Sequence, residues 1–238
     1  MSNPIKKLAS QTAIYGVSSI VGRFLNFMLT PWWTRVFLVG QFGVITEMYA
    51  YVAFLVVFLT YGMETTYFKF VHRSKKEDPS VFPTILISVL STSSLFILCA
   101  IFFSQSVADW LMYPDHSEYI VWFAIIVGVD AISSIPLAKL RKENKAIKFV
   151  TVNLVNVLVN IGLNLFFLSY CKGNYDDGVH NFVIDTFYNP EIGVGYVFIA
   201  NLIASLVKFI VMIPDMVSSS FVFNKVLYRR MIRYTTPL

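Results

Sequence analysis

Residues 82–103, with the sequence FPTILISVLSTSSLFILCAIFF, contain no charged side chain. An apolar helix of about 20 residues spans the roughly 30 Å hydrocarbon core of a bilayer. This stretch therefore predicts a transmembrane helix, and the rest of the chain repeats the pattern. Five further apolar stretches of suitable length occupy residues 8–33, 42–65, 119–137, 149–170 and 193–213. We predict an all-α fold, an integral membrane helical bundle of six transmembrane helices.

The composition of the whole chain supports this class. Of the 238 residues, 56% are hydrophobic and only 14% are charged, whereas soluble domains carry roughly 25% charged residues. A soluble fold with this balance has too few polar side chains to cover its surface. The net charge of +5 does not indicate nucleic acid as a partner, because the basic residues lie in short loops between apolar helices.

The loops alternate in charge, and this alternation predicts the orientation. Fifteen of the 19 lysines and arginines lie in the N-terminal tail, in the loops after the second and fourth apolar stretches, and in the C-terminal segment. The other loops hold seven acids, namely Asp109, Asp115, Glu118, Asp176, Asp177, Asp185 and Glu191. The positive-inside rule then places both termini in the cytoplasm. We predict a six-helix transmembrane lobe over residues 1–213, and a basic cytoplasmic segment over 214–238 that leads to a missing seventh helix.

Polar side chains form stripes along several of the apolar helices. A helix turns by about 100° per residue, so positions three and four apart share a face. Such stripes should face inward, where they either line a hydrated cavity or join helices by hydrogen bonds. The candidate binding residues on these stripes are Arg23, Asn26, Tyr51, Asn153, Asn156, Asn160, Asn164, Asn201 and Lys208.

The charges inside the apolar stretches leave alternatives open. Arg23 is either an ion-pair partner of Glu47 or Asp130, or a ligand for an anionic group such as a phosphate. Glu47 and Asp130 are either ion-pair partners or groups that couple to an ion. Lys208 either extends to the membrane surface or contributes to binding. Glu64 and Lys69 are expected to form a surface pair.

The sequence contains few signs of catalysis. It has no HExxH, no GxSxG and no glycine-rich phosphate loop. The loop acids Asp176 and Asp177 are more simply interpreted as a solvated acidic loop than as a cation site. We therefore predict a protein that is not an enzyme and has no metal and no cofactor.

Three segments resemble a known family: VGRFLNFMLTPWWTRVF at 21–37, FGVITEMYAYVAFL at 42–55 and TYGMETTYFKF at 60–70. MIRYTTPL at 231–238 resembles the entry to that family's seventh helix. The family is the bacterial polysaccharide (O-antigen type) flippases of the multidrug/oligosaccharidyl-lipid/polysaccharide exporter superfamily. The chain resembles the N-terminal half of these proteins.

The resemblance implies a transporter with two six-helix lobes around a cationic cavity. Such a protein moves oligosaccharide linked to polyprenyl pyrophosphate across the bacterial inner membrane by alternating access, with H+ or Na+ as a possible coupling ion. By this resemblance Arg23 engages the pyrophosphate. The expected partners are the lipid-linked oligosaccharide, membrane lipid, proteins of polysaccharide synthesis and the missing C-terminal lobe. We further expect Lys208 to assist Arg23, the asparagines and tyrosines to contact sugar hydroxyls, and Glu47 or Asp130 to couple transport to ions.

Three other functions compete with this prediction. A multidrug or other small-molecule exporter of the same superfamily would use acids rather than Arg23 as its main site. A non-transporting subunit of a polysaccharide-synthesis complex is the second alternative. A membrane transferase that acts on lipid-linked sugars would need paired acids or histidines at one membrane face, and the sequence offers no such set.

Overall fold

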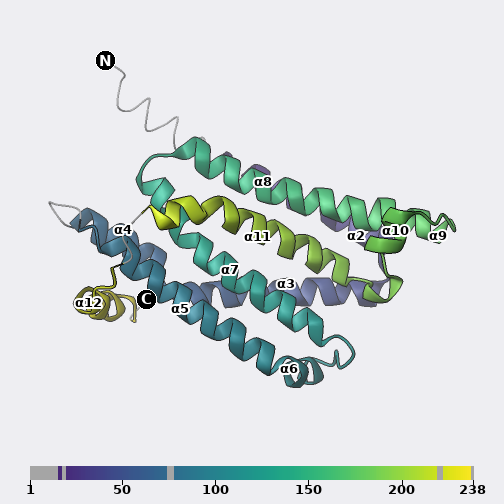
Figure 1. Cartoon of the computed structure of the whole chain (residues 1–238), viewed down its shortest axis with the longest axis horizontal. Helices are drawn as coiled ribbons and strands as arrows, with labels where there is room; N and C mark the ends of the chain where they lie inside the picture. The colour runs from purple at the N-terminus through teal and green to yellow at the C-terminus, as the bar shows by residue number, and fades with distance from the viewer. Residues whose placement is uncertain (1–15, 18–19, 74–77, 219–221, 237–238) are drawn as a thin grey trace, which may run out of the picture.

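The computed structural model describes residues 16–17, 20–73, 78–218 and 222–236, and this part of the chain is all helical (Figure 1). Five segments within it are long and apolar enough to cross a membrane: Val39–Val71, Val81–Phe102, Ser117–Lys142, Ala146–Asp176 and Gly195–Val217. They support the predicted multi-pass membrane bundle. The predicted stretch 8–33 lies partly outside the described residues. Residues 16–17 and 20–27 are helical, and we call the segment over 20–27 the first helix; residues 29–33 belong to the helix that follows it.

The helices follow one another with short connections. In chain order they are α2 (Leu29–Val36), α3 (Val39–Thr60), α4 (Met63–Arg73), α5 (Val81–Phe102), α6 (Ser104–Trp110), α7 (Ser117–Lys142), α8 (Ala146–Leu165), a π-helix (Phe166–Cys171), α9 (Lys172–Asp176), α10 (Phe182–Phe187), a 3-10 turn (Pro190–Ile192), α11 (Gly195–Val217) and α12 (Lys225–Thr235).

The second predicted helix, 42–65, is not continuous in the structure. Tyr61 and Gly62 both adopt positive φ angles, 31° and 69°, and separate α3 from α4. Left-handed backbone at a helix end is typical of a C-terminal cap. The apolar stretch continues through this point, so its length alone did not reveal the break.

Helix α7 forms the centre of the bundle. It packs against α5, α11, α3 and α8, and most of its apolar residues are buried. Its Gly128 allows α5 to approach closely, because a Cβ there would lie 2.6 Å from Cδ1 of Ile97. Small residues at helix contacts are a common packing device in membranes. In contrast, α3 and α5 expose large apolar side chains such as Phe54, Phe58 and Leu95, as expected of helices that face lipid.

The two ends of the bundle differ in charge. The α7–α8 turn, α4 and α12 lie at one end, and α6, α9 and α10 lie at the other (Figure 1). The first group carries the basic loops and the second the acidic loops, so we call them the basic end and the acidic end. The alternation predicted from the loops is therefore present in space, and the assignment of the basic end to the cytoplasm stays a prediction.

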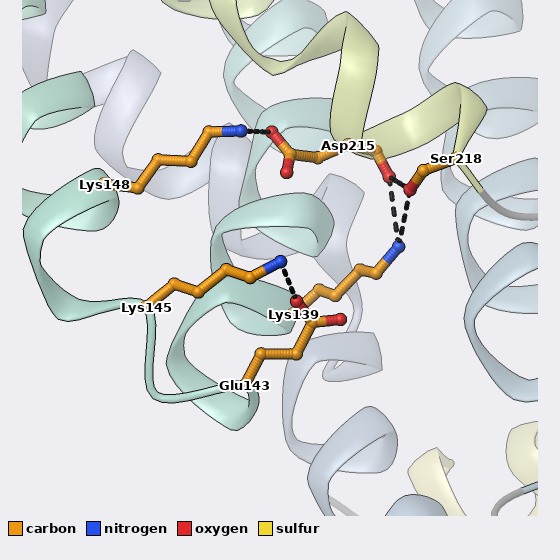
Figure 2. Close-up of polar contacts among 6 residues, drawn as sticks. All are labelled: Lys139, Glu143, Lys145, Lys148, Asp215 and Ser218. Carbon is orange, nitrogen blue, oxygen red and sulfur yellow. Dashed lines mark hydrogen bonds and ion pairs between the residues drawn. The ribbon is translucent and has the colours of Figure 1, made fainter.

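At the basic end, a polar network joins α7, α8 and α11 (Figure 2). Nζ of Lys148 on α8 lies 2.6 Å from Oδ2 of the buried Asp215 on α11. Nζ of Lys139 on α7 donates to the Asp215 carbonyl at 3.2 Å and to the Ser218 hydroxyl at 3.1 Å. Nearby, Arg141 pairs with Glu64 of α4. The surface pair predicted between Glu64 and Lys69 is therefore wrong, because the fold brings the α7 arginine to Glu64 instead.

Gly62 offers a test of the left-handed break between α3 and α4. Its φ angle is positive, and a Cβ would lie 2.7 Å from Cγ2 of Thr235 on α12. We expect Gly62→Ala to destabilise the protein by about 1–2 kcal/mol, the cost of left-handed backbone for a residue with a Cβ. Thermal unfolding of the detergent-solubilised protein measures this. Gly40→Ala is the control, since Gly40 has open space around it; an equal loss there would contradict the interpretation.

Candidate functional site

The site begins with a cleft of about 510 Å³ that is formed by the first helix together with α2, α3, α8 and α11. Its wall combines one cation with amide, hydroxyl and aromatic side chains. The lining residues are Arg23, Asn26, Phe27, Thr30, Trp33, Phe42, Ile45, Thr46, Tyr49, Asn160 and Asn201. Polar residues of the stripes predicted on the first helix, α8 and α11 thus line one cleft, and their role in binding stays a prediction.

A chain of hydrogen bonds supports one wall of this cleft. The indole Nε1 of Trp33 donates to Oδ1 of Asn164 at 2.9 Å. Nδ2 of Asn164 donates in turn to the backbone carbonyl and to Oδ1 of Asn160, at 2.9 and 3.1 Å. Nδ2 of Asn160 then donates to Oδ1 of Asn26 at 3.3 Å. Asn26 is therefore held by α8 at the cleft, three residues after Arg23 on the same helix.

Arg23 lies in the cleft wall with an exposed side chain. Among the described residues it forms no ion pair, so the two intramolecular partners considered from the sequence, Glu47 and Asp130, do not hold it. An arginine is always charged and its planar donors suit a phosphate or carboxylate. The guanidinium is thus available to an anion that enters the cleft.

The Glu47 carboxylate accepts hydrogen bonds from two tyrosine hydroxyls. Its Oε1 accepts from Tyr51 of the same helix at 2.8 Å, and its Oε2 accepts from Tyr113 at 2.6 Å. Tyr113 lies in the connection before α7; burial, together with the bond to Glu47, raises its pKa to about 12, so it remains a donor at neutral pH. Glu47 therefore links α3 to the acidic end of the bundle.

Lys208 and Asp130 form an ion pair between α11 and α7. Nζ of Lys208 lies 2.7 Å from Oδ1 of Asp130, and both side chains are largely covered. In this pair the Lys208 side chain neither extends to the membrane surface nor is free to bind a ligand, which were the two alternatives considered from the sequence. A charge pair inside the membrane region is expected, because an unpaired charge there is costly.

The structure brings together some of the predicted binding residues and separates others. Arg23, Asn26, Asn160 and Asn201 line the cleft, and the fully buried Asn164 lies behind it. The remaining predicted residues lie elsewhere. Asn153 donates to the Phe149 carbonyl of its own helix, and Asn156 is half-buried outside the cleft lining. Tyr51 lines an apolar groove between α3, α5 and α7, and Lys208 pairs with Asp130.

Several lining residues were missed as binding candidates. Trp33, Tyr49 and Phe42 belong to an aromatic cluster, in which the rings of Trp33 and Tyr49 stack with centroids 6.0 Å apart. Aromatic residues are so frequent in this chain that nothing in the sequence separates these from core residues. Thr30 had a signal, since it continues the polar stripe of Arg23 and Asn26.

A comparison with protein families identifies the relationship. Residues 33–189 match the family described as "Polysaccharide biosynthesis protein". The chain belongs to this family. Searches of curated proteins and of solved structures found no match. The chain is thus a membrane protein of the polysaccharide biosynthesis family. Within the described residues, no group of three or more His, Cys, Asp or Glu side chains is placed to hold a metal ion.

The amide chain behind the cleft can be tested by removing its central member. We expect Asn164→Leu to destabilise the protein by about 1–3 kcal/mol, because the buried Trp33 indole loses its acceptor. Unfolding in detergent, followed by tryptophan fluorescence, measures the loss. Asn153→Leu is the matched control, because among the described residues that amide bonds only its own helix; a loss as large as for Asn164 would argue against a special role of the hydrogen-bonded chain.

Proposed function

We propose that this protein moves an oligosaccharide linked to polyprenyl pyrophosphate from the cytoplasmic to the outer face of a bacterial inner membrane. Membership in the polysaccharide biosynthesis family supports the substrate class, and five apolar segments support a membrane location. The observation that carries the proposal is the cleft in which Arg23 lies without a carboxylate partner among the described residues.

The chemistry of the cleft suits a phosphorylated sugar lipid. The guanidinium binds phosphate oxygens through two parallel N–H···O bonds. Asn26, Asn160 and Asn201 offer amide donors and acceptors to sugar hydroxyls. The aromatic side chains around Tyr49 form an apolar part of the cleft wall, in which the Tyr49 ring contacts the rings of Trp33 and Phe198. Transport itself would proceed by alternating access, in which this bundle rocks against a second lobe.

Arg23 provides the test of the anion site. We expect Arg23→Ala to weaken binding of a polyprenyl pyrophosphate by roughly tenfold to hundredfold, because charge-assisted hydrogen bonds are lost. Arg23→Lys keeps the charge but not the fork, and should have an intermediate effect. Binding of the polyprenyl pyrophosphate is measured with the purified protein. Export is measured as the amount of surface polysaccharide in cells whose only copy of the protein is the variant.

The control is Arg35→Ala, since Arg35 is an exposed arginine of α2 that does not line the cleft. Normal export with both Arg23 variants, at unchanged protein levels, would exclude the proposed anion site. Two results together would instead support a small-molecule exporter. The unaltered protein would export no polysaccharide, and the Arg23→Ala variant would still export cationic dyes.

We further propose Glu47 as the better of the two candidates for ion coupling. Asp130 is already neutralised by Lys208 at 2.7 Å, whereas the partners of Glu47 on the described part of the chain are two neutral phenols. A proton or Na+ that reaches Glu47 would weaken the bonds to Tyr51 and Tyr113. It would thereby loosen α3 from the connection before α7.

Glu47→Gln should therefore make transport independent of the ion gradient while leaving substrate binding within about threefold. Flipping of a fluorescent lipid-linked sugar in vesicles, with imposed pH or Na+ gradients, measures this. Tyr113→Phe is the control that removes one hydrogen bond but keeps the ionisable carboxyl, and it should keep the gradient dependence. An unchanged gradient response of Glu47→Gln would exclude this residue from coupling.

A further inference from the structure

A second cleft, of about 660 Å³, lies at the basic end of the bundle. It is formed by α4, the start of α5 and α12, which Figure 1 shows grouped at that end. The residues on which its chemistry depends are Lys69, Asp78, Leu227, Arg230, Arg233 and Tyr234. None of them lines the cleft that contains Arg23.

The charge of this basic cleft is not balanced within the described residues. Arg230 and Arg233 are exposed and form no ion pair there. The carboxylate of Asp78 is the one described acid in the lining, and it accepts from the Ser80 amide and hydroxyl at 2.9 and 2.6 Å. These bonds lower the pKa of Asp78, so three cations face one carboxylate at neutral pH.

Other cations at the same end are used differently. Lys148 pairs with Asp215, Lys145 with Glu143, and Arg141 with Glu64; Figure 2 shows the first two of these pairs. Those residues stabilise the contacts among α4, α7, α8 and α11. The cations of the basic cleft have no comparable structural role on the described part of the chain, apart from Lys69, whose Nζ lies 3.3 Å from the centre of the Tyr234 ring.

The position of the basic cleft favours a ligand that is part of the membrane. Lys69 and Phe70 lie near the end of the membrane-spanning segment Val39–Val71, and Val81 begins the next one. A charged group bound here is therefore at the level where an apolar span meets the headgroup region. Clusters of basic residues at this level attract anionic lipids.

Helix α12 has the character of an interfacial helix. Met231 is fully buried against the core of α4 and α5, which fixes the orientation of the helix. Its outer face carries Arg229, Arg230 and Arg233 together with the exposed Val226, since these positions are three, four and seven residues apart. A helix with a basic face and adjacent exposed apolar residues typically lies in the plane of the membrane surface.

We propose that the basic cleft binds the phosphate headgroup of an anionic phospholipid from the leaflet at the basic end. Arg230 and Arg233 of α12 and Lys69 of α4 would contact the phosphate, while the acyl chains extend along the lipid-facing surface beside α5. The lipid would connect α12 to α4 and α5. This site is independent of the proposed transport function and would exist whatever the protein carries.

The test compares binding of phosphatidylglycerol and phosphatidylcholine to the full chain by native mass spectrometry. We expect the unaltered protein to retain phosphatidylglycerol in preference to phosphatidylcholine, and R230Q/R233Q to lose this preference by about tenfold. The matched control is K225Q/R229Q, which removes the same charge from exposed residues of α12 that do not line the cleft. It should change the preference by less than about threefold.

Three outcomes would overturn the proposal. Equal losses in the two double variants would indicate general surface attraction rather than a site. Displacement of phosphatidylglycerol by millimolar inorganic phosphate would indicate a site for free phosphate. No preference in the unaltered protein would exclude a lipid-phosphate site altogether. Circular dichroism melting of each variant shows whether α12 and the bundle remain folded. If R230Q/R233Q melts at the same temperature as K225Q/R229Q, the difference in lipid binding comes from the cleft and not from unfolding.

Discussion

The hydrogen-bonded chain from Trp33 through Asn164 and Asn160 to Asn26 is the interaction on which the cleft depends. Polar groups in the apolar interior of a membrane bundle are costly unless they are bonded. Asn164 and Asn160 each donate and accept within this chain, and Asn26 accepts from Asn160 and lines the cleft. The chain ties α8 to α2 and to the first helix, and so determines how closely the helix that carries Arg23 approaches the rest of the bundle.

The same constraint explains the other charged and polar contacts. Asp130 and Lys208 neutralise each other between α7 and α11, and Glu47 receives two phenolic hydrogen bonds. Asp215 receives Lys148 at the basic end. Of the cations for which the described part of the chain offers no carboxylate partner, Arg23 lines one cleft, and Arg230 with Arg233 lines the other.

The two clefts differ in the kind of anion they suit. The cleft with Arg23 combines a single guanidinium with amides and aromatic rings, which suits a ligand with both phosphate and sugar parts. The basic cleft combines several cations with an amphipathic helix at the end of two membrane-spanning segments, which suits a headgroup of the surrounding bilayer. Within a family of polysaccharide biosynthesis proteins, a substrate site and a lipid contact at separate places are chemically compatible.

The sequence alone was enough to predict the membrane class, the approximate positions of the five observed spans and the alternation of charge between the two ends. These properties are local, since about 20 consecutive apolar residues and the charge of a short loop are sufficient to produce them. It also placed Arg23, Asn26, Asn160 and Asn201 on inward-facing stripes. The tertiary structure decided which polar groups meet. It paired Asp130 with Lys208 and Glu64 with Arg141, moved Tyr51, Asn153 and Asn156 away from the cleft, and broke the second span at Tyr61 and Gly62. Partner choice depends on how helices far apart in the sequence pack around α7, and periodicity within one helix carries no information about that packing.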